Sequence, residues 1–576
     1  METKTILDPL MERLIKEKKV AQDFQNRRHE DWNDNYELYR NKVKTNRLTQ
    51  RQAVNVPLMK ETIKTLLSKI DEPPTVNFEE LSGNEVKEII VQEVWNNDYD
   101  NLNFEGIDIQ DKKTVLLYGR AFKKLNFLNG EFDIDALDIY DVIVDPMVNP
   151  LKLESARFLI HQNIFKSLRE ILANEKYSSK GKNKLKTYLS TKEGIIQSNE
   201  NRVALEKKQE RLLAMGVDDK DFAQFSAGNV IVNLTEHYTQ EWDAKKKEFN
   251  RIVTVYADNE IRLLKASLKE LIGVDFYPFV TWGEDVETQD FWSDGPADLV
   301  RVPNKILNIF MSQMIENRTL KNFQMTWYDA TVTGYKPQTY EPGPGRMLPA
   351  PGDPNKTLKA VEVSGLEDTL TQIDFLIKLI ERGTSATAIE KGVSEKKQIT
   401  LGEVEMLAGQ AREKTMSMAK FYRRSWKELA EKWYKIREAN VADTEEITLY
   451  KTSSKGKVWP KKVKGKDWKS ESGYRIEVQS TSEQEAEKTS GVQKMMAIKN
   501  QFPDNPVVYR ITQRKILELG EFSPEELREV EEWEKKKLEA PEPMAPAPAP
   551  APAPETAQLA QTAQPAPAPE MAGAIK

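Results

Sequence analysis

The chain of 576 residues contains no cysteine and only three histidines, and both shortages exclude particular kinds of site. A chain without cysteine forms no disulfide, no zinc–thiolate centre and no thiol nucleophile, which fits a reducing compartment such as the cytoplasm. The histidines, His29, His161 and His237, lie far apart and form no HxxxH or HExxH motif. We therefore expect no histidine-based metal site.

Long apolar runs are missing as well. No stretch of about 18 apolar residues occurs, so we expect no transmembrane helix. The first residues, METKTILDPLMERL, lack the apolar region of a signal peptide. The sequence thus predicts no association with a membrane.

A basic excess is also missing. Lysine and arginine total 85 and aspartate and glutamate total 91, which gives a net charge of −6. A protein that grips nucleic acid usually carries a basic excess. A conduit through which DNA slides has the opposite need, because each neutralised phosphate steepens the salt dependence of binding by about 0.9 log units.

The common motifs of catalysis are not found. There is no GxxxxGK[ST] phosphate loop, and the glycine-rich segment at 342–346 lacks the lysine and serine or threonine of such a loop. The prolines of that segment also remove amide donors that a phosphate would need. No GxSxG motif for a serine nucleophile is visible. We therefore expect that the protein is not an enzyme and has no catalytic residue and no cofactor.

Acidic residues are abundant, and some fall in closely spaced groups. Asp133 with Asp135, and Asp138 with Asp141 and Asp145, offer carboxylates that a divalent cation accepts as ligands. With 91 acidic residues such groups arise by chance, and Asp145-Pro146 is more typical of a turn. We expect no metal site.

The N-terminal half predicts helices and then strands. Apolar periodicity indicates helices within residues 1–70 and 85–120. Asn129-Gly130 is a strong hairpin signal between two alternating segments, 121–127 and 132–137. Further strands are expected at 156–161, 231–242, 249–256 and from Ile261, and a lysine-rich helical region at 164–215.

An aromatic segment, Phe276 to Val280, is expected to be a strand and leads through a turn rich in tryptophan and glycine into a helix pattern at 297–323. Residues 325–362 are dense in proline and glycine and are not expected to be helical. Helix is predicted again from Leu366 to Ile380, and a long helix from Leu401 to about Ala439. The stretch thus reads as helix, insert, helix, polar loop and long helix.

The aliphatic side chains of the second helix of this unit would contribute up to about 8–15 kcal/mol if all were buried. They are Leu366, Leu370, Ile373, Ile377 and Ile380. A bundle within one chain would bury them, and so would a neighbouring subunit of a ring. The sequence leaves both alternatives open.

The last part of the chain predicts short strands at 447–480 and helices that start near Ser482 and Ser523. From Ala540 onward the sequence is mainly alanine, proline and glutamine, which predicts a disordered or polyproline tail. This tail is either a solvated leftover or a docking arm for another protein.

The order of these elements resembles portal proteins, the head-to-tail connectors of tailed bacteriophages. The resemblance covers roughly residues 50–500 and includes Tyr118-Gly119-Arg120 before the hairpin, the turn from Asp141 to Pro146, and Ala156-Arg157-Phe158. Each motif is weakly specific alone, and their order over several hundred residues carries the resemblance. It implies an α+β fold with a wing, a helical stem, a clip and a helical crown, assembled as a ring.

The resemblance also implies a division of the chain. Residues 1–295 would form N-terminal helices and a β-rich wing, and 401–535 a long wing or crown helix with the C-terminal crown region. Between them would lie a first stem helix at 296–324, a clip at 325–365, a second stem helix at 366–382 and a tunnel loop region at 383–400. The tail would be 540–576.

A portal protein implies a homo-oligomer, expected to be a dodecamer, at one vertex of the virion capsid. Double-stranded DNA would pass through its channel during packaging and ejection. The implied partners are the terminase large subunit, head-completion, adaptor or tail proteins, and the major capsid and scaffolding proteins, after assembly in the host cytoplasm.

Specific side chains are expected in these roles. The candidates for contact with DNA in the channel are Lys391, Lys396 and Lys397 of the tunnel loop region and Lys305, Arg318 and Lys321 of the first stem helix. Phe276, Phe279, Trp282 and Trp292 are expected to pack where wing and stem meet. Each charged candidate is otherwise an ordinary solvated surface residue.

Two other functions remain alternatives. One is a different virion structural protein, such as a tail or scaffold component, although scaffolds are usually more uniformly helical. The other is an accessory subunit of a DNA-packaging enzyme, against which the missing phosphate loop argues.

Overall fold

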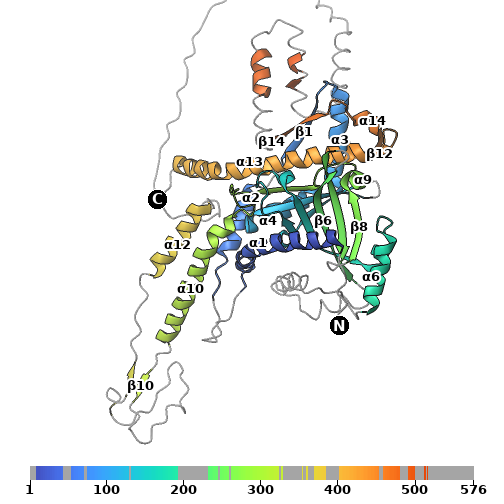
Figure 1. Cartoon of the computed structure of the whole chain (residues 1–576). Coiled ribbons are helices and arrows are strands. Elements are labelled where there is room, and N and C mark those ends of the chain that lie inside the picture. The colour runs from blue at the N-terminus through green and yellow to red at the C-terminus, as the bar shows by residue number, and fades with distance from the viewer. Residues whose placement is uncertain are drawn as a thin grey trace, which may run out of the picture. The chain divides into compact units, whose positions relative to one another are not determined.

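The computed structural model describes residues 8–42, 54–70, 74–128, 131–191, 231–243, 247–257, 261–322, 326–328, 353, 358–360, 369–384, 401–452, 458–479, 491–499, 511–513 and 515–516. The chain divides into two units, residues 1–486 and 487–576. In the second unit residues 491–499 are helical. All other elements below belong to the first unit (Figure 1).

A five-stranded antiparallel sheet forms one part of the body. Its strands follow in chain order: β4 (Val142–Val144), β5 (Phe158–Ser167), β6 (Ile231–Asp243), β7 (Glu248–Ala257) and β8 (Ile261–Ser267). The predicted ribbon of β6, β7 and β8 is thereby confirmed. The lysine-rich region was predicted as helix from residue 164, but β5 continues to Ser167, because residues 164–167 pair with β6. The short helices α5 (Leu168–Ala173) and α6 (Ser179–Thr191) follow.

Helix α1 (Pro9–Tyr39) lies along this sheet as one continuous element (Figure 1). Its Pro9 stands in the first turn, where a missing N–H costs nothing, and the Asp8 side chain accepts a hydrogen bond from the amide of Leu10. The buried side chain of Gln25 donates to the carbonyls of Ile139 and Val142, at 2.9 Å each. These bonds tie the helix to the start of β4.

A three-stranded antiparallel sheet has the order β3-β2-β9, with β2 at Arg120–Leu128, β3 at Glu131–Leu137 and β9 at Phe279–Gly283. The predicted hairpin is confirmed, because Leu128 pairs with Glu131 across residues 129–130. The aromatic segment at 276–280 was predicted as strand throughout. Strand β9 instead begins at Phe279, after Pro278, which has no N–H to donate to a ladder.

Helix α4 (Phe104–Tyr118) packs on strands β2 and β3, and α2 (Leu58–Lys69) and α3 (Glu85–Asn101) pack on α4. Strand β1 (Thr75–Glu80) pairs antiparallel with β14 (Tyr474–Gln479). Two distant parts of the chain therefore share one small sheet. The same large apolar core contains Val91 of α3, Phe122 of β2 and Trp433, which lies more than three hundred residues after Phe122 in the sequence.

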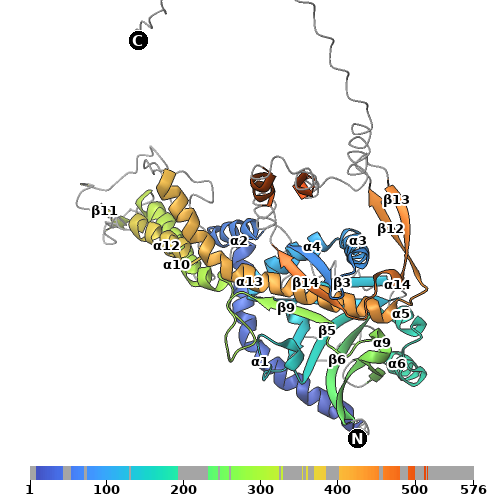
Figure 2. The ribbon, with the colours of Figure 1, turned by 90° about the horizontal axis from the view of Figure 1, so that it is seen from above.

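The long helix α13 (Leu401–Asn440) crosses the body beside β9 (Figure 2). It is followed by β12 (Glu446–Thr452), β13 (Val458–Lys464) and α14 (Gly465–Trp468). From Met418 onward, its apolar residues at intervals of three or four are buried, as the periodicity predicts. Lys432 of this helix donates to the carbonyls of Tyr277 and Phe279, at 3.1 and 2.7 Å, and so covers backbone groups at the edge strand β9.

The helix–insert–helix unit consists of α10 (Pro296–Asn322), the short antiparallel pair β10 (Thr326–Tyr328) and β11 (Leu358–Ala360), and α12 (Thr369–Thr384). Among the described residues, none of the helices is both long and apolar enough to span a membrane. The mixture of helices with antiparallel sheets confirms the α+β class.

Candidate functional site at the α10–α12 helix pair

Helix α10 starts directly after the aromatic loop, and proline and aspartate define its first turn. Pro296 stands at the first helical position, where its fixed φ suits the helix. The Asp298 carboxylate accepts from the amide of Gly295 at 2.9 Å and from the Asn35 amide group at 3.0 Å. An acidic side chain in the first turn also interacts favourably with the helix dipole. The start of α10 is therefore fixed by the chain around it.

The loop before α10 lies in direct contact with the end of α4, and a glycine permits this. Gly119 has a φ of +84°, and a Cβ at this position would lie 1.9 Å from the carbonyl oxygen of Ser293. The Ser293 hydroxyl donates to the Gly119 carbonyl at 3.1 Å. Only a residue without a side chain fits both the left-handed conformation and the close approach.

Trp292 anchors this loop in the core. Its ring meets the ring of Trp32 edge to face at 5.3 Å and that of Phe122 at 6.1 Å. Aromatic pairs in this geometry contribute about 0.5–1.5 kcal/mol beyond their buried area. The packing of Trp292 thus links the start of α10 to helix α1 and strand β2.

The other aromatic residues predicted to pack near this point lie farther from α10. Phe279 is buried against Tyr238 of β6 at 5.1 Å. Trp282 is buried beside Tyr422 of α13. Phe276 is half-buried, and the ammonium of Lys432 lies 5.6 Å from its ring. Of the four, Trp292 alone borders the start of the helix.

One face of α10 is tied to α1 and to residues 54–56 by polar contacts. Its residues 301, 305, 308 and 312 follow at intervals of four, three and four, which places them on one side of the helix. Their partners are Asp31 for Arg301 at 3.0 Å, Asp34 for Lys305, the amide of Val56 for Asn308 at 2.8 Å, and the amide of Val54 for Ser312 at 3.1 Å.

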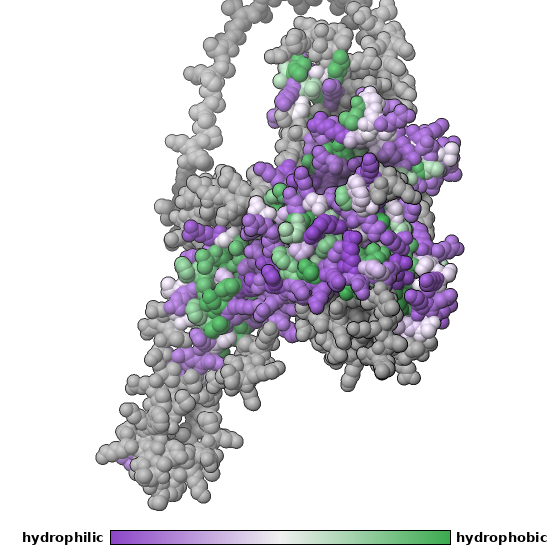
Figure 3. Space-filling model, viewed as in Figure 1, coloured by the Kyte–Doolittle hydropathy of each residue, from purple (hydrophilic) through white to green (hydrophobic). Residues whose placement is uncertain are grey.

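An adjacent face of α10 is apolar and exposed. Its residues, which we call the α10 stripe, also follow at intervals of three, four and three. The α10 stripe consists of Leu299, Val302, Ile306 and Ile309, with exposed fractions of 59%, 56%, 36% and 54%. Apolar side chains cluster over this part of the molecule in the space-filling view (Figure 3).

Helix α12 packs against α10 and divides its own apolar side chains between two sides. Ile380 is buried, and Ile373 and Ile377 pack against the main core, so part of the predicted stripe is covered within the chain. Leu370 is exposed, and Leu366 lies outside the described residues. Phe375 and Leu379, one turn apart, are 64% and 46% exposed.

The charged residues predicted to meet DNA are only partly described. Lys305 lies in α10 and pairs with Asp34, which offsets its charge. Arg318 and Lys321 lie near the C-terminal end of α10 and are exposed. Lys391, Lys396 and Lys397, like all of the tunnel loop region 383–400 after residue 384, lie outside the described residues.

The acidic groups that the sequence offered as cation ligands bind protein groups instead. Asp138 accepts from the amide of Tyr140, and Asp141 accepts from Asn163 at 2.7 Å. Asp145 accepts from the amide of Met147 and from Arg157, at 3.0 and 2.7 Å, as expected for a turn. Within the part of the chain that the structure describes, no three His, Asp or Glu side chains are placed to hold a metal ion.

The geometry therefore points to an interaction surface. Residues 299–309 have the helical periodicity of a buried face, so the sequence contains the signal of the α10 stripe. It does not reveal that the body of the same chain leaves this face uncovered. Contiguous exposed apolar surface of this kind marks a binding site for another protein.

A comparison with known protein families identifies a match over most of the chain. The family model described as phage SU10 portal protein matches residues 19–567 of the chain. No curated protein matches the chain.

Proposed function

The chain belongs to the phage SU10 portal protein family, and from this premise we propose that its copies form a ring at one capsid vertex. DNA would be packaged through the channel of this ring and later ejected through it. The family expectation for the ring is a dodecamer. The proposed partners are the terminase large subunit during packaging and head-completion, adaptor or tail proteins afterwards, with capsid and scaffolding proteins around the ring.

The α10 stripe is the observation that carries the proposal of a ring. Fully burying one aliphatic side chain contributes about 1.5–3 kcal/mol, so four side chains on one face are a substantial driving force for association. A ring repeats one heterologous contact around a closed circle, so each copy needs two different surfaces. The α10 stripe would be one of them, and the face of α12 with Phe375 and Leu379 is the candidate for the other.

The division of the chain follows from the same proposal. Residues 296–324 and 366–382 would be the stem helices, and 325–365 the clip that docks the terminase and then an adaptor. Residues 1–295 would form the wing, 383–400 the tunnel loop region and 401–535 the crown region with its leading helix. In this division, the β1–β14 pairing would join the wing to the middle of the 401–535 region through one small sheet.

An association experiment tests the ring. Val302→Glu together with Ile309→Glu places charges on the α10 stripe, while Val20→Glu with Val86→Glu places equal charges at apolar positions of α1 and α3 that are 63% and 65% exposed. We expect rings with a central hole from the unaltered protein and the control in negative-stain microscopy and sedimentation. The stripe variant should remain monomeric with an unchanged circular dichroism spectrum.

Two results would contradict this part of the proposal. If the stripe variant forms rings as abundantly as the control, α10 is not part of the interface. An unaltered protein that stays monomeric, or that forms fibres, would count against the ring itself and favour another virion component.

The proposed DNA contacts need a separate test. Twelve copies turn a single lysine into a ring of charge, so a few residues suffice despite the net charge of −6. Lys391→Gln, Lys396→Gln and Lys397→Gln in one variant should lower packaged DNA and its retention. The matched control neutralises Lys180, Lys184 and Lys186, which are exposed on α6. If both variants package the same amount of DNA, the three lysines do not contact DNA in the channel.

Arg318 and Lys321 of α10 are the described candidates for a second contact with DNA, since their exposed side chains are available to a phosphate. Lys305 is the weaker one because Asp34 already neutralises it. Neutralising Arg318 and Lys321 together should therefore change DNA retention more than neutralising Lys305.

A further inference from the structure

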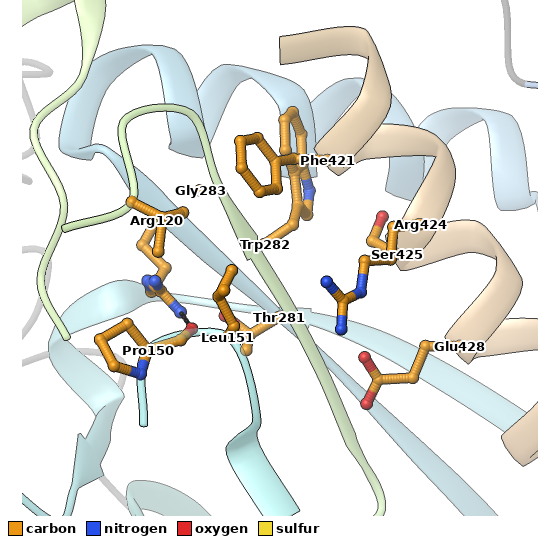
Figure 4. A pocket seen from close by; sticks show the side chains of 11 residues that line it. Arg120, Pro150, Leu151, Thr281, Trp282, Gly283, Phe421, Arg424, Ser425 and Glu428 are labelled. Atoms are coloured by element: carbon orange, nitrogen blue, oxygen red, sulfur yellow. Dashed lines mark hydrogen bonds between the residues drawn. The ribbon is translucent and has the colours of Figure 1, made fainter. Parts of the chain in front are cut away.

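A small pocket lies between strands β2 and β9, the loop after β4 and helix α13. It encloses about 30 Å³ and is lined by Arg120, Pro150 and Leu151 on one side and by Arg424 and Glu428 of α13 on the other (Figure 4). At about 10–15 Å³ for each water-sized probe, this space accommodates two or three waters or one group of the size of a carboxylate.

The unusual member of this lining is Arg120, which is 1% exposed. One amino group donates to the Pro150 carbonyl at 3.1 Å, and the guanidinium carbon lies 4.0 Å from the centre of the Phe291 ring. Its Nε and its other amino nitrogen have no hydrogen-bond partner. A buried guanidinium is normally paired with an acid and hydrogen-bonded.

The two unpartnered nitrogens of Arg120 belong to one edge of the guanidinium. Nε and Nη2 point their N–H groups in parallel, which is the geometry that receives two oxygens of one oxyanion. Arg437 and Arg157 use this same edge to hold the carboxylates of Asp98 and Asp145, at 2.6–2.9 Å. In Arg120 the edge is free.

The charge around Arg120 is not balanced either. Burial lowers the pKa of Arg120 to about 9, and Asp290 offsets this only in part. Glu428, the acid that lines the pocket, is held by Lys432 at 2.9 Å. Arg424, exposed at the rim, adds a second positive charge.

The two hydroxyl groups that line the pocket already donate their hydrogens to backbone carbonyls, so they are not available to an anion. The Ser425 hydroxyl donates to the Tyr422 carbonyl at 2.7 Å, and the Thr281 hydroxyl donates to the Ala121 carbonyl at 2.8 Å. The side-chain donors that the pocket offers to an anion are therefore those of Arg120 and Arg424. Leu151, which is 51% exposed, lies next to the Arg120 guanidinium in Figure 4 and would have to move aside for an oxygen to reach the free edge.

We propose that this pocket binds one oxyanion, of the class of a carboxylate or a phosphate, between Arg120 of β2 and Arg424 of α13. The oxyanion accepts both hydrogens of the free Arg120 edge and meets Arg424 from the other side. Its source is either a free anion or an acidic side chain of a second copy. In both cases it links α13 to the body and supplies the counter-charge that Arg120 lacks.

The first experiment uses full-length protein kept monomeric by Val302→Glu and Ile309→Glu. Inorganic phosphate and acetate, each compared with chloride at equal ionic strength, should raise the melting temperature saturably. Arg120→Met should weaken the apparent affinity about tenfold or more. Arg424→Gln should weaken it less, and Arg169→Met, at an exposed arginine of α5, should leave it unchanged.

The melting temperature in chloride alone provides a second readout. If Arg120 acts only as a structural group, Arg120→Met should lower it. If Arg120 is an uncompensated charge awaiting an anion, Arg120→Met should leave it unchanged or raise it. Should Arg120→Met fail to fold, Arg424→Gln carries the test, because its side chain is at the surface.

The same titration on assembled rings identifies the source of the oxyanion. If the anion is free, phosphate and acetate stabilise monomers and rings alike. If a second copy supplies a carboxylate, they stabilise monomers only, and Arg120→Met weakens the ring. Monomers that respond to neither phosphate nor acetate beyond chloride would overturn the proposal, whether or not the protein forms rings.

Discussion

The long helices α10 and α13 have similar apolar periodicity and opposite surroundings. In α13 the apolar residues from Met418 to Ile436 are buried in the core of their own chain. In α10 the four residues of the α10 stripe have the same spacing and are exposed, although Val300 and Leu307 of the same helix are buried. A helical stripe indicates that a face of the helix is covered, but not by what. The stripe of α13 is covered by its own chain, whereas the α10 stripe is left exposed by its chain and is the face that the proposed ring would cover.

The polar contacts of the two helices differ in the same way. Arg437 of α13 forms a two-pronged pair with Asp98 of α3, and Trp433 donates to the same carboxylate at 2.8 Å, all of them buried. The acidic partners of α10, such as Asp31 and Asp34, are partly exposed. Buried pairs fix a helix in place, whereas exposed pairs contribute little.

The largest expected effect on the free energy of unfolding comes from removing a buried partner of α13. Asp98→Ala leaves the Arg437 guanidinium buried without its counter-charge and the Trp433 N–H without an acceptor. Removing one partner of a buried pair costs about 3–5 kcal/mol. Urea unfolding of the monomeric protein should show a loss of this size, and Asp98→Ala with Arg437→Met should recover part of it.

The matched change on the other helix is Asp31→Ala, which removes one of the two acidic partners of Arg301 at a partly exposed site and leaves Asp298 at 2.7 Å. An exposed pair contributes about 0–1 kcal/mol, so the loss should be several times smaller. Equal losses for Asp98→Ala and Asp31→Ala would refute the contrast between the two helices.

An intermediate effect is expected at Glu284, in the loop that leads to α10. Burial, with a smaller contribution from Asp285, raises the pKa of this carboxyl to about 7, and its Oε2 has no partner. Since the folded pKa lies above the unfolded value near 4.5, the folded state binds the extra proton between these pH values. The free energy of unfolding therefore falls as pH rises from about 4.5 to 7.

Glu284→Gln removes this dependence. The variant should match the unaltered protein near pH 4 and exceed it at pH 8 by up to about 3 kcal/mol, at 1.36 kcal/mol for each pKa unit. Glu287→Gln, at an exposed position of the same loop, is the control and should change little. Parallel pH profiles for all three proteins would show that Glu284 is not a buried, unpaired acid.

Local signals predicted most of the elements that hold the site. The hairpin signal at 129–130 predicted β2 and β3, and the helix predicted at 297–323 is α10 at Pro296–Asn322. Proline at a first helical position and alternation in strands act over a few residues, so they are readable in sequence.

Tertiary contacts could not be predicted in this way. Asp98 and Asp108 lie in helices whose sequences look like ordinary solvated ones, yet both are buried under side chains of α13 more than three hundred residues away. The same holds for Lys305, because its partner Asp34 lies 271 residues away in the sequence and nothing local indicates the pairing. The exposure of the α10 stripe could not be predicted either, because it depends on how the rest of the chain packs around α10.

The smallest expected effect is a single polar substitution in the α10 stripe, and it separates folding from association. Val302→Ser removes apolar surface that is already in water in the monomer, so the free energy of unfolding of the monomeric protein should change by no more than about 0.5 kcal/mol. In a ring the same change would be repeated at every interface, and the concentration at which rings dissociate should rise. Val300→Ser, two residues away and fully buried, should instead lower the stability of the monomer. If Val302→Ser destabilises the monomer as much as Val300→Ser, the α10 stripe is covered within the chain, and the contrast with α13 fails.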